Sequence, residues 1–143
     1  MPMENVSTQS ANQIDFSSKV ENLSLVEKFI DNVCEENKIN QDFYGNILIA
    51  LTEAVNNAIF HGNNNDPQKK VTVAYKQSND GILFSVEDQG KGFNYDALPD
   101  PTDPENIEKP NGRGVFLMKH LADKVDFHNN GRKVELEFKV SAN

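Results

Sequence analysis

Cysteine and long apolar runs are scarce in this sequence, and each scarcity excludes a class of protein. Cys34 is the only cysteine among 143 residues, so no internal disulfide is possible, which fits a reducing cytoplasm. The longest apolar run, Ile47 to Leu51, is far too short to span a bilayer. The polar N-terminus lacks the basic and apolar segments of a signal peptide. We therefore expect a cytoplasmic protein without a membrane anchor, in which Cys34 is a small apolar residue on a helix face.

Positive charge is also scarce. The chain has 14 Lys and Arg against 22 Asp and Glu, which gives a formal net charge of -8. This balance repels phosphate backbones and anionic membrane surfaces, so we expect neither nucleic acid nor membrane as a partner. An acidic protein that binds an anionic nucleotide needs local positive charge at the site to offset the repulsion. A metal ion, a helix N-terminus or a few cationic side chains directed at the nucleotide can supply it.

The length and the hydrophobic pattern predict one domain of the α+β class. Residues 1–12 are polar and are expected to form a flexible tail, which leaves 13–143 as a single domain. The pattern predicts, in order, a strand at 14–20, a helix capped by Asn22 or Ser24, a helix at 41–61, strands at 71–75 and 82–86, an irregular stretch at 90–110, a helix ending near Asp123, and a final hairpin at 124–140. This order indicates a two-layer α/β sandwich, with one mixed, mainly antiparallel sheet and helices on one face.

A first candidate group of site residues is Glu53 and Asn57 in the second predicted helix. Residues four apart lie one turn above each other on the same face. A carboxylate accepts a proton, and an amide carbonyl is a hard oxygen ligand suited to Mg²⁺. A solvated helix face explains the pair alone equally well, but the neighbouring Ala54, Ala58 and Ile59 indicate that part of this face is buried.

Two glycine-containing segments complete the pattern. Asp88, Gly90 and Gly92 follow a predicted strand, where a carboxylate accepts the exocyclic amine of a purine and glycines let the backbone approach a flat ring. Gly112 and Gly114 open the last predicted helix, where free N–H groups bind anions. Taken singly, the first is also typical of a plain turn and the second of a flexible hinge. The second is not a Walker P-loop, because the Gly-Lys-Ser/Thr ending is absent.

The three segments together, in this order, resemble the N box and the two glycine boxes of the Bergerat-fold (GHKL) ATPases. That superfamily includes gyrase, histidine kinases and the bacterial anti-sigma-factor serine kinases, and the last group is the most similar. The resemblance runs from about residue 14 to 140, and the segment from Glu53 to Gly62 reads very like theirs. It implies the Bergerat, or histidine-kinase-like, ATPase fold.

The resemblance also implies a role for each residue. Glu53 is the general base that activates the attacking hydroxyl, Asn57 holds Mg²⁺ on the ATP phosphates, and Asp88 binds the adenine amine. The residues that would shape the pocket are Gly90, Gly92, Gly112 and Gly114, and residues 93–111 would be the ATP lid. Members of the group phosphorylate a serine on an anti-anti-sigma (STAS-type) protein and sequester a sigma factor as homodimers.

The sequence departs from the family pattern at two places. Many relatives carry an Arg in the lid just before the second glycine box, where this chain has Lys109, Pro110 and Asn111. Lys109 and Arg113 are both candidates to neutralise phosphate charge. Relatives also often carry a Thr after the last hairpin glycine, whereas here Arg132 follows Gly131, so nucleotide affinity or base preference is open to change.

Three functional interpretations remain open. The first is an ATP-dependent protein serine kinase that also binds a sigma factor, favoured by the presence of Glu53, which a pure binder does not need. The second is a non-catalytic, nucleotide-responsive module that acts by sequestration. The third is a detached histidine-kinase catalytic domain, which a partner with a phospho-acceptor His would reveal. The chain's own histidines share no metal-site spacing and are expected to be structural, with His61 the best placed of them.

Overall fold

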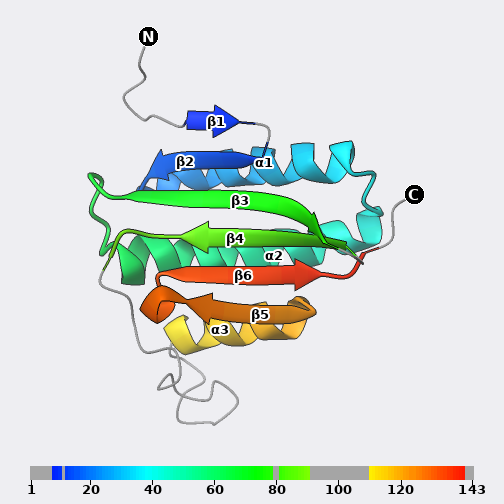
Figure 1. Ribbon diagram of the computed structural model, residues 1–143. Helices are drawn as coiled ribbons and strands as arrows, with labels where there is room; N and C mark the ends of the chain where they lie inside the picture. The colour runs from blue at the N-terminus through cyan, green and yellow to red at the C-terminus, as the bar shows by residue number, and fades with distance from the viewer. Residues whose placement is uncertain (1–7, 11, 79–80, 91–109, 141–143) are drawn as a thin grey trace.

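The computed structural model describes residues 8–10, 12–78, 81–90 and 110–140. Among these residues, a six-stranded sheet forms one layer and three α-helices cover one of its faces (Figure 1). The strands are β1 (Thr8–Ser10), β2 (Gln13–Ser17), β3 (Lys70–Ser78), β4 (Gly81–Glu87), β5 (Lys124–His128) and β6 (Lys133–Phe138). The helices are α1 (Leu23–Glu36), α2 (Gln41–Asn57) and α3 (Pro110–Leu121). The predicted two-layer α+β fold is confirmed.

The strand order in the sheet is β1-β2-β3-β4-β6-β5, and every described pairing is antiparallel. Ser78 pairs with Gly81, so β3 and β4 form the predicted hairpin around residues 79–80, which lie outside the described part. The last strand of the chain, β6, lies between β4 and β5 and pairs Val86 with Val134 and Phe84 with Leu136. The strand end that carries Asp88 therefore lies beside the start of β6.

The core lies between the sheet and the helices. Buried and less buried residues alternate along β4 and β6, as expected for strands with one covered face. Phe16, Phe84 and Leu136 from three strands are fully buried against apolar residues of α1 and α2. In the helical layer α2 lies behind the central strands, between α1 and α3 (Figure 1). Because α2 is central, its C-terminal end lies close to the end of β4 and the start of β6.

Cys34 lies in α1 and is only 8% exposed. Burial, and after it the nearby charge of Asp31, raises the pKa of this thiol to about 11. The thiol is therefore protonated at neutral pH and has little of the thiolate character that a nucleophile needs. This placement agrees with the predicted role of an apolar residue on a helix face.

Several boundaries differ from the sequence-based prediction. Residues 8–10, within the predicted tail, form β1 and pair with β2. The first predicted strand ends at Ser17 rather than residue 20, because Ser18 turns the chain by donating both its N–H and its hydroxyl to the carbonyl of Lys69. Helix α3 already begins at Pro110, inside the predicted lid, and proline suits a first helical turn because that position needs no N–H.

Candidate functional site

Helix α2 presents Glu53 and Asn57 on one side. Asn40 caps the helix by accepting a hydrogen bond from the backbone N–H of Asp42 at 2.9 Å. Both Glu53 and Asn57 are part-buried and face the start of α3. A Cβ atom built on Gly114 would lie 3.1 Å from Glu53 Oε1 and 3.4 Å from both amide atoms of Asn57. Three predicted site residues thus lie together, and the glycine leaves room beside the two side chains.

The chain continues from Asn57 into one π-helical turn, η2 (Ala58–Gly62), where a regular α-helix was predicted. Single π turns are rare and occur often at functional sites. This turn brings Gly62 so close to Asp88 and Gly90 that a Cβ built on Gly62 would overlap the Asp88 carboxylate, and one built on Gly90 would overlap the Gly62 carbonyl. Glycine is required at both positions by this close approach, so the end of α2 and the end of β4 are in direct contact.

Asn63 connects these segments. Its side chain is fully buried, and its amide nitrogen donates to Ser18 Oγ at 2.7 Å and to the Lys70 carbonyl at 3.0 Å. Its amide oxygen accepts a hydrogen bond from the backbone N–H of Gln89 at 2.8 Å. Asn63 therefore holds the segment after β4, which carries Asp88 and Gly90, against the start of β3.

Asp88 is the most buried carboxylate of the site, with 7% of its surface exposed. Its backbone N–H donates to the Arg132 carbonyl at 2.8 Å, and its Oδ1 accepts from the Gly90 N–H at 2.9 Å. No described residue donates to the other carboxylate oxygen, Oδ2. Burial raises the pKa of Asp88, while the Gly90 N–H and then the charge of Arg132 act to lower it.

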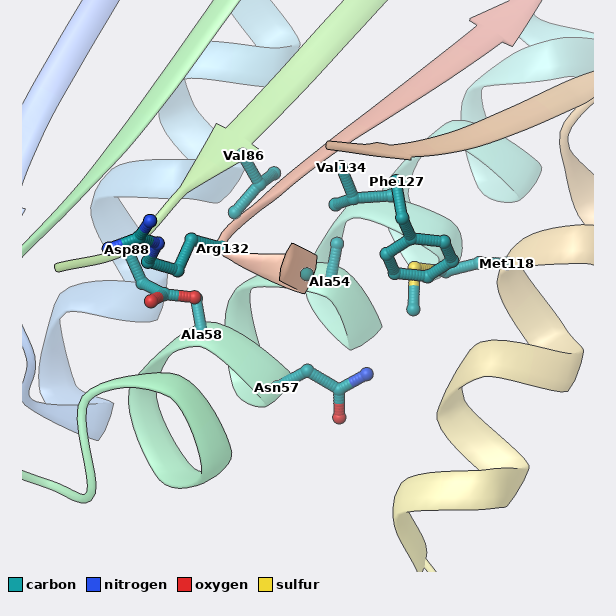
Figure 2. Close-up of a pocket in the computed structure, with 10 residues that line it drawn as sticks. Ala54, Asn57, Ala58, Val86, Asp88, Met118, Phe127, Arg132 and Val134 are labelled. Carbon is teal, nitrogen blue, oxygen red and sulfur yellow. The ribbon is translucent and has the colours of Figure 1, made fainter. Parts of the chain in front are cut away.

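A pocket opens between the C-terminal end of α2, η2, α3 and the strands β4, β5 and β6 (Figure 2). Asp88 and Arg132 lie on one side of it, and Met118 and Phe127 lie on the other (Figure 2). The pocket is lined by Ala54, Asn57, Ala58, Val86, Asp88, Met118, Phe127, Gly131, Arg132 and Val134.

The composition of this lining fits a flat heterocycle that carries a polar edge. Most of the wall is aliphatic, aromatic or thioether, which favours stacking against an apolar ring face. The buried carboxylate of Asp88 offers an acceptor for an exocyclic amine. Asn57, at the edge nearest α3, offers a hard oxygen ligand beside Glu53 and Gly114.

The structure does not place all of the predicted site residues at this pocket. Gly92, Lys109 and residues 93–109 of the predicted lid lie outside the described part of the chain. Gly112 and Arg113 belong to the first turns of α3, and the side chain of Arg113 is not described. Which cation faces the phosphates therefore stays a prediction.

The structure also adds pocket residues that the motifs did not identify, chiefly Met118, Phe127 and Arg132. Met118 and Phe127 carry no polar signal, and only the pairing of β5 with β6 brings Phe127 opposite Val134 at the pocket. Arg132 stood out in the sequence only as a departure from the family pattern after Gly131. Its position in the pocket next to Asp88 was not predicted.

The histidines contribute nothing to the pocket lining. His61 is exposed in η2, His120 stacks on Phe116 with ring centroids 5.9 Å apart, and His128 Nε2 lies 2.9 Å from Glu135 Oε1. Across residues 12–78, 81–90 and 110–140 there is no cluster of three His, Cys, Asp or Glu side chains that resembles a metal site. Nor does any described helix have the length and apolar character to cross a membrane.

Comparison with known families gives a match over nearly the whole described domain. The model of the histidine kinase-like ATPase domain matches residues 16–138. The chain belongs to the histidine kinase-like ATPase family. This confirms the resemblance drawn from the N box and the two glycine boxes, and the segments that carry those motifs all fall inside the matched range.

Individual relatives of this histidine kinase-like ATPase are bacterial regulators. It is 27% identical over 156 residues to "Serine-protein kinase RsbW" of Staphylococcus epidermidis, covering 91% of this chain and 98% of the relative. It is 31% identical over 116 residues to "Anti-sigma F factor" of Geobacillus thermodenitrificans, covering 78% of each chain. A second serine-protein kinase RsbW, from Bacillus mycoides, is 25% identical over 129 residues.

Proposed function

We propose that this chain is an ATP-dependent protein serine kinase that phosphorylates an anti-anti-sigma (STAS-type) protein and also sequesters a sigma factor. The observation that carries the proposal is the buried Asp88 carboxylate in an apolar pocket whose opposite edge carries Asn57, next to Glu53. The names of the relatives support it, since they include both a serine-protein kinase and an anti-sigma factor.

In this proposal Asp88 binds the adenine base. The Gly90 N–H already occupies Oδ1, so Oδ2 is left to accept the exocyclic amine of the base. Ala58, Val86 and Val134 supply apolar surface for the ring faces. A base with a carbonyl in place of the amine, as in guanine, would set two acceptors against each other, so we expect selectivity for adenine over guanine.

Asn57 and Glu53 would serve the phosphate end. The amide oxygen of Asn57 is a suitable Mg²⁺ ligand, and the absence of a side chain at Gly114 leaves space next to it. Bound Mg²⁺ supplies charge neutralisation for the phosphates, which a chain of net charge -8 needs. Helix starts bind anions through their free N–H groups, and the beginning of α3 lies beside Asn57 at Gly114.

In this proposal Glu53 acts as the general base. Its carboxylate borders both Asn57 and Gly114, at the edge of the phosphate region. In the proposed step Glu53 takes the proton of the serine hydroxyl, while the serine oxygen forms its bond to the γ-phosphorus and ADP departs. Positioning and charge stabilisation do most of the work in such transfers.

Partner binding and assembly follow the same proposal. Binding of a sigma factor is proposed from the resemblance and from the name of an anti-sigma relative. A cytoplasmic homodimer is proposed from the resemblance alone. Residues 93–109, which precede α3, are proposed to act as the ATP lid, with Gly92, Gly112, and either Lys109 or Arg113, at the phosphates.

The test begins with calorimetric titration of ATP, with and without Mg²⁺, into the wild type and Asp88→Asn. We expect Mg²⁺-dependent binding that is weakened at least a hundredfold in the variant.

The second step measures transfer of labelled phosphate to a purified anti-anti-sigma protein. Here Glu53→Gln should bind ATP normally, and its transfer rate should fall at least a hundredfold. Glu53→Gln with an unchanged rate would favour a different base. ATP binding without transfer in the wild type would instead favour the non-catalytic binding module, and transfer to a histidine-bearing partner would favour the histidine-kinase alternative.

A further inference from the structure

The outward face of α2 and η2 carries a stripe of three exposed residues and one part-buried residue. Gly45, Ile49, Asn56 and Phe60, which we call the outer stripe, follow one another at spacings of four, seven and four residues, so they share one side of the helix. Ile49 is 47% exposed and Phe60 is 38% exposed. The buried residues of α2 lie on the opposite side, toward the sheet. The stripe thus presents two large apolar side chains to solvent, one on each side of Glu53 along the helix.

Gly45 supplies an independent observation. It lies inside α2, where glycine is among the least favourable residues, yet a Cβ built there meets nothing within 4 Å. Its φ is not in the left-handed region, because Gly131 is the glycine of the described chain with positive φ. Neither packing nor backbone conformation explains a glycine here. What it leaves is a smooth patch at which another backbone can approach α2 closely.

The outer stripe is continuous with the proposed catalytic base. Glu53 follows Ile49 by one turn and precedes Phe60 by seven residues, so it lies about 6 Å and about 10 Å from them along the axis. Its carboxylate lies at the border between the stripe and α3. Any protein that delivers a hydroxyl to Glu53 must therefore cover helix surface on both sides of it.

We propose that the outer stripe is the docking surface for the serine-bearing protein substrate, whose apolar side chains pack on Ile49 and Phe60 on either side of the acceptor serine. This inference rests on the proposed kinase function. The two large side chains of the stripe are apolar, so recognition here depends on apolar contact and on close approach at Gly45.

The experiment measures phosphotransfer from ATP to the purified, unphosphorylated anti-anti-sigma protein of the same organism, over a range of its concentration. We expect Ile49→Asp and Phe60→Asp each to raise the KM for that protein at least tenfold, with ATP affinity by calorimetry unchanged within twofold. Val20→Asp is the matched control, since Val20 is 51% exposed and apolar but lies in η1 (Val20–Asn22), away from α2. Its KM should stay within twofold of the wild type.

Gly45 separates docking from folding. Gly45→Leu should raise the melting temperature, because leucine favours helix and has free space at this position, and should also raise the KM at least fivefold. A variant that only damaged the fold would not combine a higher melting temperature with a higher KM. Gly45→Ala should raise the melting temperature with a smaller rise in KM.

The outcomes distinguish this inference from the proposal beneath it. No transfer by the wild type would overturn the kinase function and the docking surface together. Normal transfer with unchanged KM in all the stripe variants would overturn the docking surface alone. A fall in molecular mass by sedimentation in Ile49→Asp and Phe60→Asp, with unchanged KM, would assign the stripe to contact between two copies of this chain and would also overturn the inference.

Discussion

Asp88 shows how a single residue sets stability against ligand binding. Burial disfavours its charged form and raises its pKa, so an ionised Asp88 costs the empty protein stability at neutral pH. Because the pKa of Asp88 is higher in the folded protein than in the unfolded chain, its contribution to stability is fully present at pH values below the unfolded pKa. That contribution is lost as the pH rises through the pKa of the folded protein. The same ionised carboxylate is the better acceptor for an adenine amine. The protein thus keeps a charge that its fold alone does not favour.

We therefore predict that Asp88→Asn raises the melting temperature of the nucleotide-free protein at pH 7 while it weakens ATP binding. Asparagine keeps an oxygen for the Gly90 N–H and removes the buried charge. The stability difference should shrink as pH falls through the raised pKa, because the wild-type carboxyl is then neutral as well. ATP affinity of the wild type should fall over the same pH interval. Calorimetric melting and ATP titration across pH check both trends.

Asp126→Asn is the control for this prediction. Asp126 is a part-exposed carboxylate in β5, with its Oδ2 3.7 Å from Lys124 Nζ. Its replacement should neither raise the melting temperature at pH 7 nor change ATP affinity. If Asp88→Asn melts below the wild type at pH 7 and this gap persists at low pH, the charge of Asp88 does not oppose folding.

At the residue scale, the sequence predicted which motif residues lie close together in the described part of the chain. Glu53 and Asn57 lie together because helix periodicity fixes residues four apart, and Gly114 lies next to them as the order of the motifs indicated. The position of Arg132 could not be predicted from the sequence. Arg132 lies near Asp88 because β6 pairs with β4 as well as with β5, the strand that precedes it in the chain.

At the element scale, the segment from η2 to β3 decides how the two halves of the site meet. The sequence predicted a helix up to residue 61, but the last turn is π-helical. Periodicity does not distinguish the two, since the wider turn is fixed by the contact of Gly62 with Asp88 and Gly90. Asn63 holds this contact through one buried amide, which looks in the sequence like one more polar loop residue.

We predict that Asn63→Ala destabilises the protein by about 2–4 kcal/mol, since it leaves buried partners unpaired. ATP affinity should fall as well, at least tenfold, because the Gln89 N–H that orders the segment after Asp88 loses its acceptor. Urea unfolding and ATP calorimetry measure the two effects.

The control is Asn37→Ala, which removes an amide that bonds the Val33 carbonyl and Gln77 at the far end of α1. It should cost less stability and leave ATP affinity unchanged. If Asn63→Ala unfolds at a lower urea concentration but binds ATP as the wild type does, Asn63 supports the fold without ordering the site.

At the scale of the whole molecule, layer and class were predictable but the sheet order was not. Alternating strands and amphipathic helices require a covered sheet face, which gives two layers. The position of β6 between β4 and β5 depends on long-range pairing such as Phe84 with Leu136, which local pattern does not encode. This order brings η2, β4, β6 and α3 around one pocket, so a nucleotide bound there would contact elements from the middle and from the end of the chain.

Such a ligand should stabilise the entire domain. We predict that ATP with Mg²⁺, at about a hundred times its Kd, adds about 2.7 kcal/mol to the free energy of unfolding. For a chain of this size that corresponds to a rise of roughly 5–11 °C in melting temperature. Glu53→Gln should retain the full rise, because the base is not needed to hold nucleotide. Asn57→Ala should lose the part of the rise that depends on Mg²⁺, because it removes the amide oxygen proposed as the metal ligand. Differential scanning calorimetry with ATP, with ATP and Mg²⁺, and with Mg²⁺ alone separates these contributions. An equal Mg²⁺ dependence in Asn57→Ala and the wild type would assign the metal to other ligands.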